Sequence, residues 1–133
     1  MLVPTHPGFG GTARPAGLAS TRDLAAAYVA LLDELELTDV TVIGNSFGGW
    51  VAVEMALLDS PRVSGAVIVD GIGIEVDDHP MTKVGGLAPA ELAKLSFHDP
   101  AKAPRPPAGG GSGPSPDIAA LIAYAGRACP TPA

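Results

Sequence analysis

The segment VTVIGNSFGGW, residues 40 to 50, places a serine between glycines at the point where an apolar run stops. Its centre, Gly44-Asn45-Ser46-Phe47-Gly48, matches Gly-x-Ser-x-Gly, the pattern of a serine nucleophile on a sharp turn from a strand into a helix. The alternative is an ordinary turn that uses glycine only for space. Because a strand is predicted before the motif and a helix after it, we expect Ser46 to be a nucleophile.

The glycines of this motif have a steric explanation. A turn this sharp holds the serine in a strained backbone conformation, and larger side chains two residues away would collide. We expect Gly44, Gly48 and also Gly49 to remove that collision. The N–H of Phe47, at the start of the helix, can then donate to an oxyanion, and the helix dipole favours that charge. One half of an oxyanion hole is therefore expected at the backbone of Phe47.

The segment before the motif predicts a loop and then a helix. Residues 4 to 17 (PTHPGFGGTARPAG) are rich in proline and glycine, which indicates an irregular loop. Ser20 and Asp23 have the spacing of a capping box, and apolar residues then recur at helical spacing. An amphipathic helix is therefore expected over residues 21 to 36.

The motif itself lies between two predicted strands. Short β-rich runs at residues 40 to 44 and 63 to 69 lack strict alternation, as expected of parallel strands covered on both faces. Residues 47 to 58 are almost all apolar or small, which predicts a mostly buried helix. Strand, helix and strand at this spacing predict a parallel βαβ unit and therefore an α/β fold.

The composition argues against several classes of function. With 133 residues, 47% of them hydrophobic and 17% charged, the chain suits one globular domain. Its formal net charge of −6 argues against nucleic acid or an anionic membrane surface as partner. No apolar run reaches the roughly 18 residues that span a bilayer, and no signal peptide is recognisable, so a cytoplasmic location is expected. The single Cys129 supports neither a disulfide nor a metal cluster, and we expect no cofactor and no metal.

Through VTVIGNSFGGW and through residues 4 to 10 (PTHPGFG), the sequence resembles the α/β-hydrolase superfamily. The resemblance implies a partial α/β-hydrolase fold, with a parallel βαβ core and a helical, lid-like C-terminal region. Short helices are expected in that region at residues 89 to 97 and 117 to 125, the second capped by Asp117. The expected divisions are a core at 1–75, a lid-like segment at 76–126 with a flexible Pro/Gly-rich stretch at 101–116, and a disordered tail at 127–133.

The family's chain order is serine, then an acidic residue, then histidine. Asp70 is the candidate acid, because it ends the second predicted strand at the carboxyl edge of the sheet, where some hydrolases place their acid. His79 and His98 follow Ser46 but fall in the lid-like segment, and we expect neither to be the base. His6 is expected to be a loop residue.

The resemblance also implies missing parts. The first three strands of the family's sheet and the loop that gives the second oxyanion donor would precede residue 2, and the base would follow the last strand. Their absence would leave the strand at 40 to 44 with an open edge. Without a base Ser46 is an ordinary alcohol, so we expect this chain to be incomplete and inactive by itself.

The function that the resemblance implies is a serine hydrolase, esterase-like, acting on a small-molecule ester or related acyl substrate. Serine at the centre of the motif argues against the branches whose nucleophile is a carboxylate. Two alternatives stay open: a non-catalytic ligand- or partner-binding protein that keeps the turn as structure, and an enzyme of the cofactor-free haloperoxidase or perhydrolase type.

Overall fold

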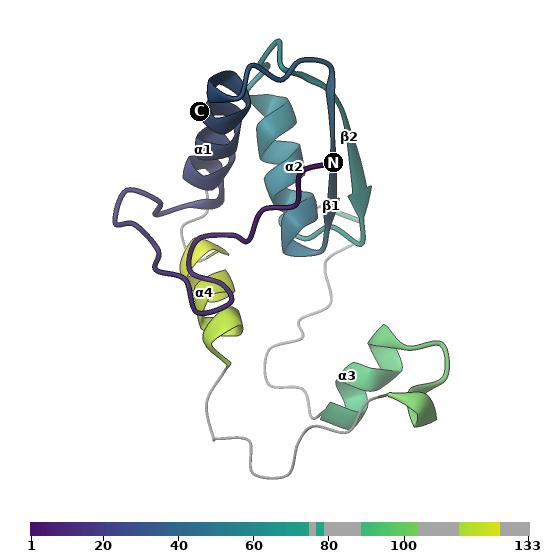
Figure 1. Cartoon of the computed structure of the whole chain (residues 1–133). Coiled ribbons are helices and arrows are strands. Elements are labelled where there is room, and N and C mark those ends of the chain that lie inside the picture. Colours follow the sequence, from purple (N-terminus) through teal and green to yellow (C-terminus); the bar gives the residue numbers. More distant parts are fainter. Residues whose placement is uncertain (75–76, 79–88, 104–114, 126–133) are drawn as a thin grey trace. The chain divides into compact units, whose positions relative to one another are not determined.

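A computed structural model describes residues 1–74, 77–78, 89–103 and 115–125 (Figure 1). These residues belong to two compact units. The first unit contains residues 1–74 together with the helix near the C-terminus, and the second lies between them in the sequence. No helix in the described part of the chain is long and apolar enough to cross a bilayer.

The first unit is built on a parallel pair of strands, β1 (Val40–Asn45) and β2 (Val63–Val69). Helix α1 (Thr21–Glu34) precedes β1, and helix α2 (Phe47–Leu57) connects the two strands. Both helices lie on the same side of the sheet in Figure 1, and α2 packs on both strands and on α1. This arrangement confirms the predicted α/β class and the parallel βαβ unit.

The core of this unit lies between the two helices and the sheet. Leu24 and Leu32 of α1 meet Val51 and Met55 of α2, and all four are nearly inaccessible to water. Each such burial stabilises the fold by about 1.5–3 kcal/mol. The helix predicted over 47 to 58 is therefore mostly buried, as its composition indicated.

The opposite face of the sheet is bare in the described part of the chain. Ile43 pairs with Val67 and Asn45 with Val69, so these side chains share the face away from α2. Ile43 is 71% exposed, and Val67 and Val69 are 46% and 43% exposed. Coverage of both faces, which the strand sequences suggested, is not observed for the described residues.

Of the two helix caps predicted from the sequence, the one at the start of α1 is observed and the one at the start of α4 is not. Ser20 and Asp23 form the predicted box: the Asp23 N–H donates to Ser20 Oγ over 3.1 Å, and the Ser20 N–H donates to Asp23 Oδ2 over 2.9 Å. Helix α4 (Pro116–Ala125) differs, because Ser115 Oγ accepts the N–H of Ile118 at 3.3 Å. The predicted cap at Asp117 is therefore wrong, and that carboxylate is used elsewhere.

The second unit contains a short helix α3 (Pro89–Ser96) and a 3-10 turn η1 (Pro100–Lys102). Asp99 Oδ1 caps η1 by accepting the Ala101 N–H at 3.2 Å. The helix expected at 89 to 97 is thus present. Most of the stretch at 101–116 and all of the tail at 127–133 lie outside the described residues, and the predicted domain boundaries stay a prediction.

Helix α4 is part of the first unit, whereas the sequence predicts it in the lid-like segment. Tyr124, which is fully buried, donates its hydroxyl proton to the carbonyl of Pro7 at 3.0 Å. The Gly10 N–H donates to Asp117 Oδ1 at 2.9 Å. Two hydrogen bonds therefore attach α4 to the loop at residues 4 to 17.

Candidate active site

Ser46 lies between the last residue of β1 and the first residue of α2. Its backbone has φ 52° and ψ −116°, outside the regions that L-residues normally occupy. A conformation of this kind costs about 1–3 kcal/mol and persists only where the surroundings enforce it. Here the Ser46 N–H donates to Val69 O at 2.9 Å, and Ser46 O accepts from Gly49 N at 3.0 Å and Ile72 N at 3.4 Å. Main-chain bonds to β2, to α2 and to the loop after β2 thus hold the strained turn.

Two of the three glycines do what the sequence predicted. A Cβ at Gly44 would collide with the carbonyl group of Gly48 and with Gly49 N, which are main-chain atoms of the first helical turn. A Cβ at Gly49 would lie 2.9 Å from Gly71 Cα. A Cβ at Gly48 would meet nothing within 4 Å, so the steric role assigned to Gly48 is wrong. The close approach is made by the backbone of Gly48, which any residue has.

The Ser46 side chain is exposed, and its hydroxyl makes no hydrogen bond in the described part of the chain. The N–H of Phe47 precedes the Gly49 N–H, the first that bonds back to Ser46 O, so it has no intrahelical partner. Free N–H groups at a helix start attract negative charge, and the helix dipole adds to this. The geometry is therefore suited to an anion formed next to Ser46.

Among the described residues, the candidate acid and the histidines that follow Ser46 in the sequence make no hydrogen bond to Ser46. Asp70 directly follows β2, at the same carboxyl edge of the sheet as Ser46, and is exposed with φ 45°. No hydrogen bond joins it to another described residue, and its role as the acid stays a prediction. His79 lies outside the described residues, and His98 is an exposed residue of the second unit.

His6 is more than a loop residue, because it lies in a half-buried polar pair. Its Nδ1 is 2.6 Å from the Tyr28 hydroxyl. Burial lowers the pKa of His6, and burial, assisted by repulsion from Tyr124, raises the pKa of Tyr28 to about 12. Both shifts favour a neutral imidazole that accepts the phenol proton. His6 and Ser46 line the same cavity, but no hydrogen bond connects them.

The Phe47 ring is surrounded by aromatic rings. Phe9 stacks on it with ring centroids 5.7 Å apart, and His6 meets it edge-on, also at 5.7 Å. Tyr124 of α4 is 5.7 Å away and Trp50 is 6.5 Å away. Offset and edge-to-face pairs at these distances are each worth about 0.5–1.5 kcal/mol beyond burial. The rings thus attach the residue that carries the candidate oxyanion donor to the loop and to α4.

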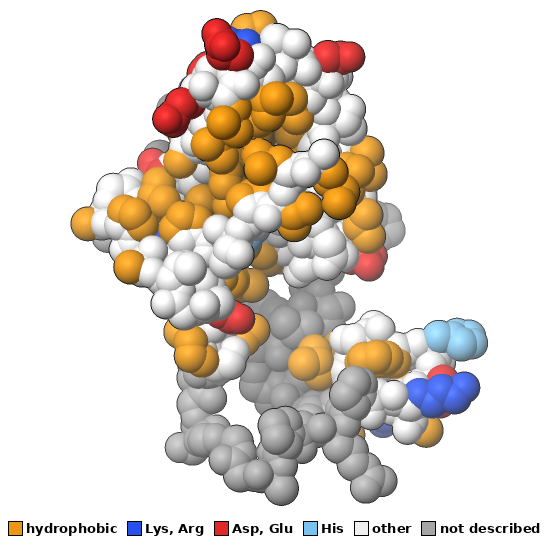
Figure 2. All heavy atoms as spheres, viewed as in Figure 1, with side chains coloured by type: hydrophobic (Ala, Val, Ile, Leu, Met, Phe, Trp, Pro, Cys, Tyr) orange, Lys and Arg blue, Asp and Glu red, His pale blue; other side chains and the backbone are white. Residues whose placement is uncertain are grey.

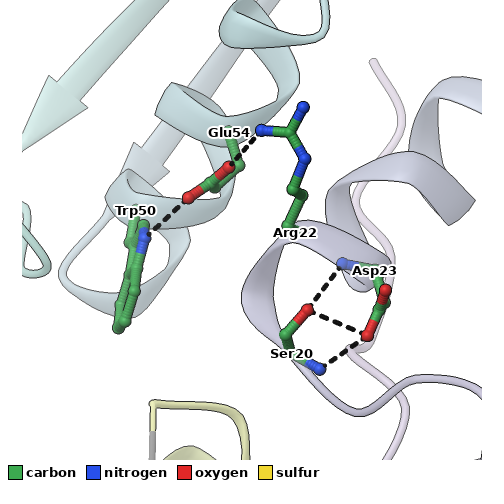
Figure 3. A network of polar contacts seen from close by, with 5 residues as sticks. All are labelled: Ser20, Arg22, Asp23, Trp50 and Glu54. Atoms are coloured by element: carbon green, nitrogen blue, oxygen red, sulfur yellow. Dashed lines mark hydrogen bonds and ion pairs between the residues drawn. The ribbon is translucent and has the colours of Figure 1, made fainter. Parts of the chain in front are cut away.

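A polar network joins the middle of α2 to the first turn of α1 (Figure 3). Glu54, only 8% exposed, accepts from Trp50 Nε1 at 3.2 Å and is 3.5 Å from Arg22 NH1. A buried carboxylate needs such partners, because an unpaired one is strongly disfavoured. The single charge in α2 is therefore structural, and it keeps the helix that begins at the serine turn in place.

The described residues provide a serine and a local anion site, but no base in contact with Ser46. They also contain no group of three or more acidic, histidine or cysteine side chains that could hold a metal ion. The arrangement can therefore orient an attacking hydroxyl and stabilise a developing oxyanion. Proton removal from Ser46 needs a group that these residues do not supply.

A βαβ unit with a strained serine at the strand-to-helix turn is the arrangement that the resemblance to the α/β-hydrolase superfamily implies, and comparison with known protein families agrees with it. The sequence matches the alpha/beta hydrolase family over residues 1–131. The chain belongs to this family. As an alpha/beta hydrolase family member it has the predicted fold, and its relatives include hydrolases.

Three curated relatives illustrate this similarity. The chain is 35% identical over 75 residues to the 2-hydroxymuconate semialdehyde hydrolase of Pseudomonas sp. (strain CF600), which is 56% of this chain and 26% of that protein. It is 30% identical over 94 residues to the carbendazim hydrolyzing esterase of Nocardioides sp. (strain SG-4G), 70% of this chain and 39% of that protein. It is 44% identical over 62 residues to the homoserine O-acetyltransferase of Thermus thermophilus, 44% of this chain and 16% of that protein. The chain thus spans well under half the length of these relatives.

Proposed function

We propose that this chain carries the nucleophile half of a serine hydrolase active site, with Ser46 as the attacking residue and the Phe47 N–H as an oxyanion donor. The observation that carries the proposal is the strained backbone of Ser46 at φ 52° and ψ −116°, enforced by main-chain bonds. Strain of this kind in an exposed serine has no benefit for stability, whereas it presents the hydroxyl to a substrate.

The substrate class is a small-molecule ester or related acyl compound. The similar proteins include one named as an esterase and one as an acetyltransferase, which supports acyl chemistry at this serine. In such a reaction Ser46 Oγ bonds to the carbonyl carbon, its proton passes to a base, and negative charge develops on the carbonyl oxygen near the Phe47 N–H. Asp70, at the same edge of the sheet, is the candidate acid.

The base and the second oxyanion donor come, in this proposal, from polypeptide outside these 133 residues. Two findings support this: no described residue contacts the Ser46 hydroxyl as a base, and the chain spans only 26% and 39% of two relatives. Removal of a triad member leaves only the catalysis that binding and the oxyanion hole provide. We therefore expect the 133-residue chain to have no useful turnover.

The test compares p-nitrophenyl acetate hydrolysis by this chain and by the product of the coding sequence read beyond both ends, each with Ser46 or with Ser46→Ala. We expect turnover from the longer protein only, abolished by Ser46→Ala. If the 133-residue chain hydrolyses the ester and Ser46→Ala abolishes this activity, the base does not come from outside these residues and that part of the proposal is overturned. A longer, folded protein whose turnover survives Ser46→Ala would overturn the assignment of Ser46 as the nucleophile. A coding sequence that extends no further would overturn the proposal that additional polypeptide supplies the base and the second oxyanion donor.

A second candidate function is a non-catalytic binding protein of the same fold. It is favoured by the lack of a base near Ser46 among the described residues. In that case the longer protein, shown to be folded, would hydrolyse no activated ester, and Ser46→Ala would leave ligand binding unchanged.

A further inference from the structure

The peptide group between Ser46 and Phe47 carries the candidate oxyanion donor, and it is held at both ends. At one end Ser46 O accepts main-chain bonds from Gly49 N and Ile72 N. At the other end is Phe47, the first residue of α2, whose side chain is only 4% exposed. A side chain in a helix adopts few rotamers, so a ring that cannot move keeps its own Cα in place. The contacts of the Phe47 ring therefore help to set the direction of the Phe47 N–H.

Two rings from the loop at residues 4 to 17 contact the Phe47 ring. His6 meets it edge-on and Phe9 stacks on it, each with ring centroids 5.7 Å from those of Phe47. The rings of His6 and Phe9 also contact each other edge-on at 5.6 Å, and the Phe9 N–H donates to His6 O at 3.0 Å. A displacement of His6 would therefore also displace the ring that stacks on Phe47.

A directional bond holds the His6 ring. Its Nδ1 lies 2.6 Å from the hydroxyl of Tyr28 in α1, the helix that packs on α2. Aromatic contacts tolerate a range of offsets and tilts, whereas a short hydrogen bond fixes both a distance and a direction. Because one partner donates and the other accepts with either tautomer of the neutral imidazole, the ring is fixed in both cases. The bond thus connects the rings around Phe47 to α1.

The polarity of this pair is not needed for burial. Figure 2 shows hydrophobic side chains gathered on the face of the first unit that the N-terminal segment crosses. For stability alone, two apolar rings of the same shape would be nearly equivalent to His6 and Tyr28, because a hydrogen bond between neutral groups contributes little net free energy. The feature that only the polar pair provides is a fixed orientation of the His6 ring.

We propose that His6 and Tyr28 are positioning residues for the reaction at Ser46. Their hydrogen bond fixes the rings that hold Phe47 and, through them, the direction of the Phe47 N–H toward the oxyanion. Neither residue contacts the substrate in this proposal. The inference rests on the proposed function, because the pair affects the reaction only if the Phe47 N–H is the oxyanion donor.

The first test measures the direction of the N–H itself. Residual dipolar couplings of the ¹⁵N-labelled 133-residue chain report the orientation of each N–H bond. Tyr28→Phe removes one oxygen and keeps both rings, so we expect it to shift the coupling at Phe47 and to leave those of β1 and β2 unchanged. Ser20→Ala, which breaks the capping box of α1, is the control for lower stability and should leave the Phe47 coupling unchanged. An unchanged Phe47 coupling in Tyr28→Phe would overturn the proposal.

The second test measures the reaction of Ser46 with a fluorophosphonate at fixed imidazole concentration and pH. A misdirected oxyanion donor slows bond formation without weakening the binding of the reagent. We expect Tyr28→Phe and His6→Phe each to lower the maximal labelling rate at least about fivefold and to change the half-saturating reagent concentration less than about twofold. Rates are compared per folded molecule, so that a loss of stability alone does not lower them. Ser20→Ala should therefore label at the rate of the unaltered chain.

The variant with both substitutions distinguishes a pair from two independent residues. Tyr28→Phe and His6→Phe break the same bond, so the double variant should label less than about twofold more slowly than either single variant. Three results would overturn the proposal: unchanged maximal rates in the single variants, effects that multiply in the double variant, or a change confined to the half-saturating concentration.

Failure of the proposed function gives a different result. If Ser46 is labelled in no variant and not in the unaltered chain, the nucleophile assignment is overturned, and with it the role of the pair in the reaction. A shifted Phe47 coupling in Tyr28→Phe would then still show that the pair orients the N–H. If Ser46 is labelled equally in all variants, the nucleophile assignment stands and the positioning role of His6 and Tyr28 is overturned.

Discussion

Gly44 and Gly48 belong to one motif, yet the structure predicts opposite responses to alanine. A Cβ at Gly44 would collide with the carbonyl group of Gly48 and lie 2.6 Å from Gly49 N. These are main-chain atoms of the first turn of α2, so the helix would have to move away from β1. Overpacking in a core costs about 1–3 kcal/mol when side chains can adjust. Because the backbone must move here, we expect Gly44→Ala to lower the free energy of unfolding by about 3 kcal/mol or more.

Gly48→Ala is the matched control, because a Cβ there meets nothing within 4 Å. Alanine is favoured over glycine in a helix by up to about 1 kcal/mol, so this variant should gain about 0.5 kcal/mol. Urea titrations followed by the fluorescence of Trp50, the single tryptophan, measure both changes. With a slope of about 1–3 kcal/mol per molar urea, the Gly44→Ala midpoint should fall by about 1 M or more. Equal midpoints for the two variants would refute the steric argument for Gly44.

Three further predictions concern the residues that anchor the turn. Tyr124→Phe removes the hydroxyl that donates to Pro7 and should lower the free energy of unfolding by about 1 kcal/mol. Tyr124→Ala also removes the buried ring and should lower it by about 3–5 kcal/mol. Similar losses for the two variants would contradict the separate role of the hydrogen bond. Glu54→Ala leaves the Trp50 N–H without an acceptor and should lower the free energy of unfolding by about 1–3 kcal/mol. Glu54→Gln keeps an acceptor and should lower it by less than about 1 kcal/mol. Equal losses for the two variants would count against the network. Burial lowers the pKa of His6 below 6.5, so its contribution to the free energy of unfolding should be complete above pH 6.5 and be lost as the pH falls further. The urea midpoint should therefore be lower at about pH 5.5 than at about pH 7. The same difference between these two midpoints in His6→Gln would contradict this.

The local elements were predictable from the sequence because their signals are local. The strand at Val63–Val69 and the start of α2 at Phe47 have the expected bounds, and the Ser20 box forms as its spacing indicates. The turn at Ser46 was also predictable, since β-branched residues before it favour a strand and the apolar or small residues after it favour a buried helix. Among the described residues β1 pairs only with β2.

The contacts around the site were not predictable, because they join residues that are distant in the sequence. Tyr124 meets Pro7, and Asp117 meets Gly10, across more than a hundred residues. No periodicity or spacing marks such pairs. Asp117 looked like a cap because acidic residues favour helix starts, but Ser115 takes that role. Gly48 shows a second limit, since a motif position can be glycine without any steric need for it.

A further gap concerns His6. Proline and glycine around it indicated only a loop, and its pairing with Tyr28 depends on how that loop lies against α1. The resulting burial changes the pKa of both groups. A sequence signal for such a pair would have to couple a loop position with a helix position, and neither propensity nor hydrophobic pattern does so.

The most direct test of the account asks whether Ser46 is a nucleophile that reacts once a base is supplied. The folded 133-residue chain is treated with a fluorophosphonate and increasing imidazole, and the labelled residue is identified by mass spectrometry of peptides. Ser46 Oγ bonds to phosphorus, fluoride leaves, and imidazole takes the proton. The account predicts an adduct on Ser46 whose rate of formation rises with imidazole, is abolished by Ser46→Ala and is unaffected by Ser64→Ala, a change at an exposed serine of β2. Absence of an adduct on Ser46 at every imidazole concentration, or labelling of Ser64 at the same rate, would contradict it.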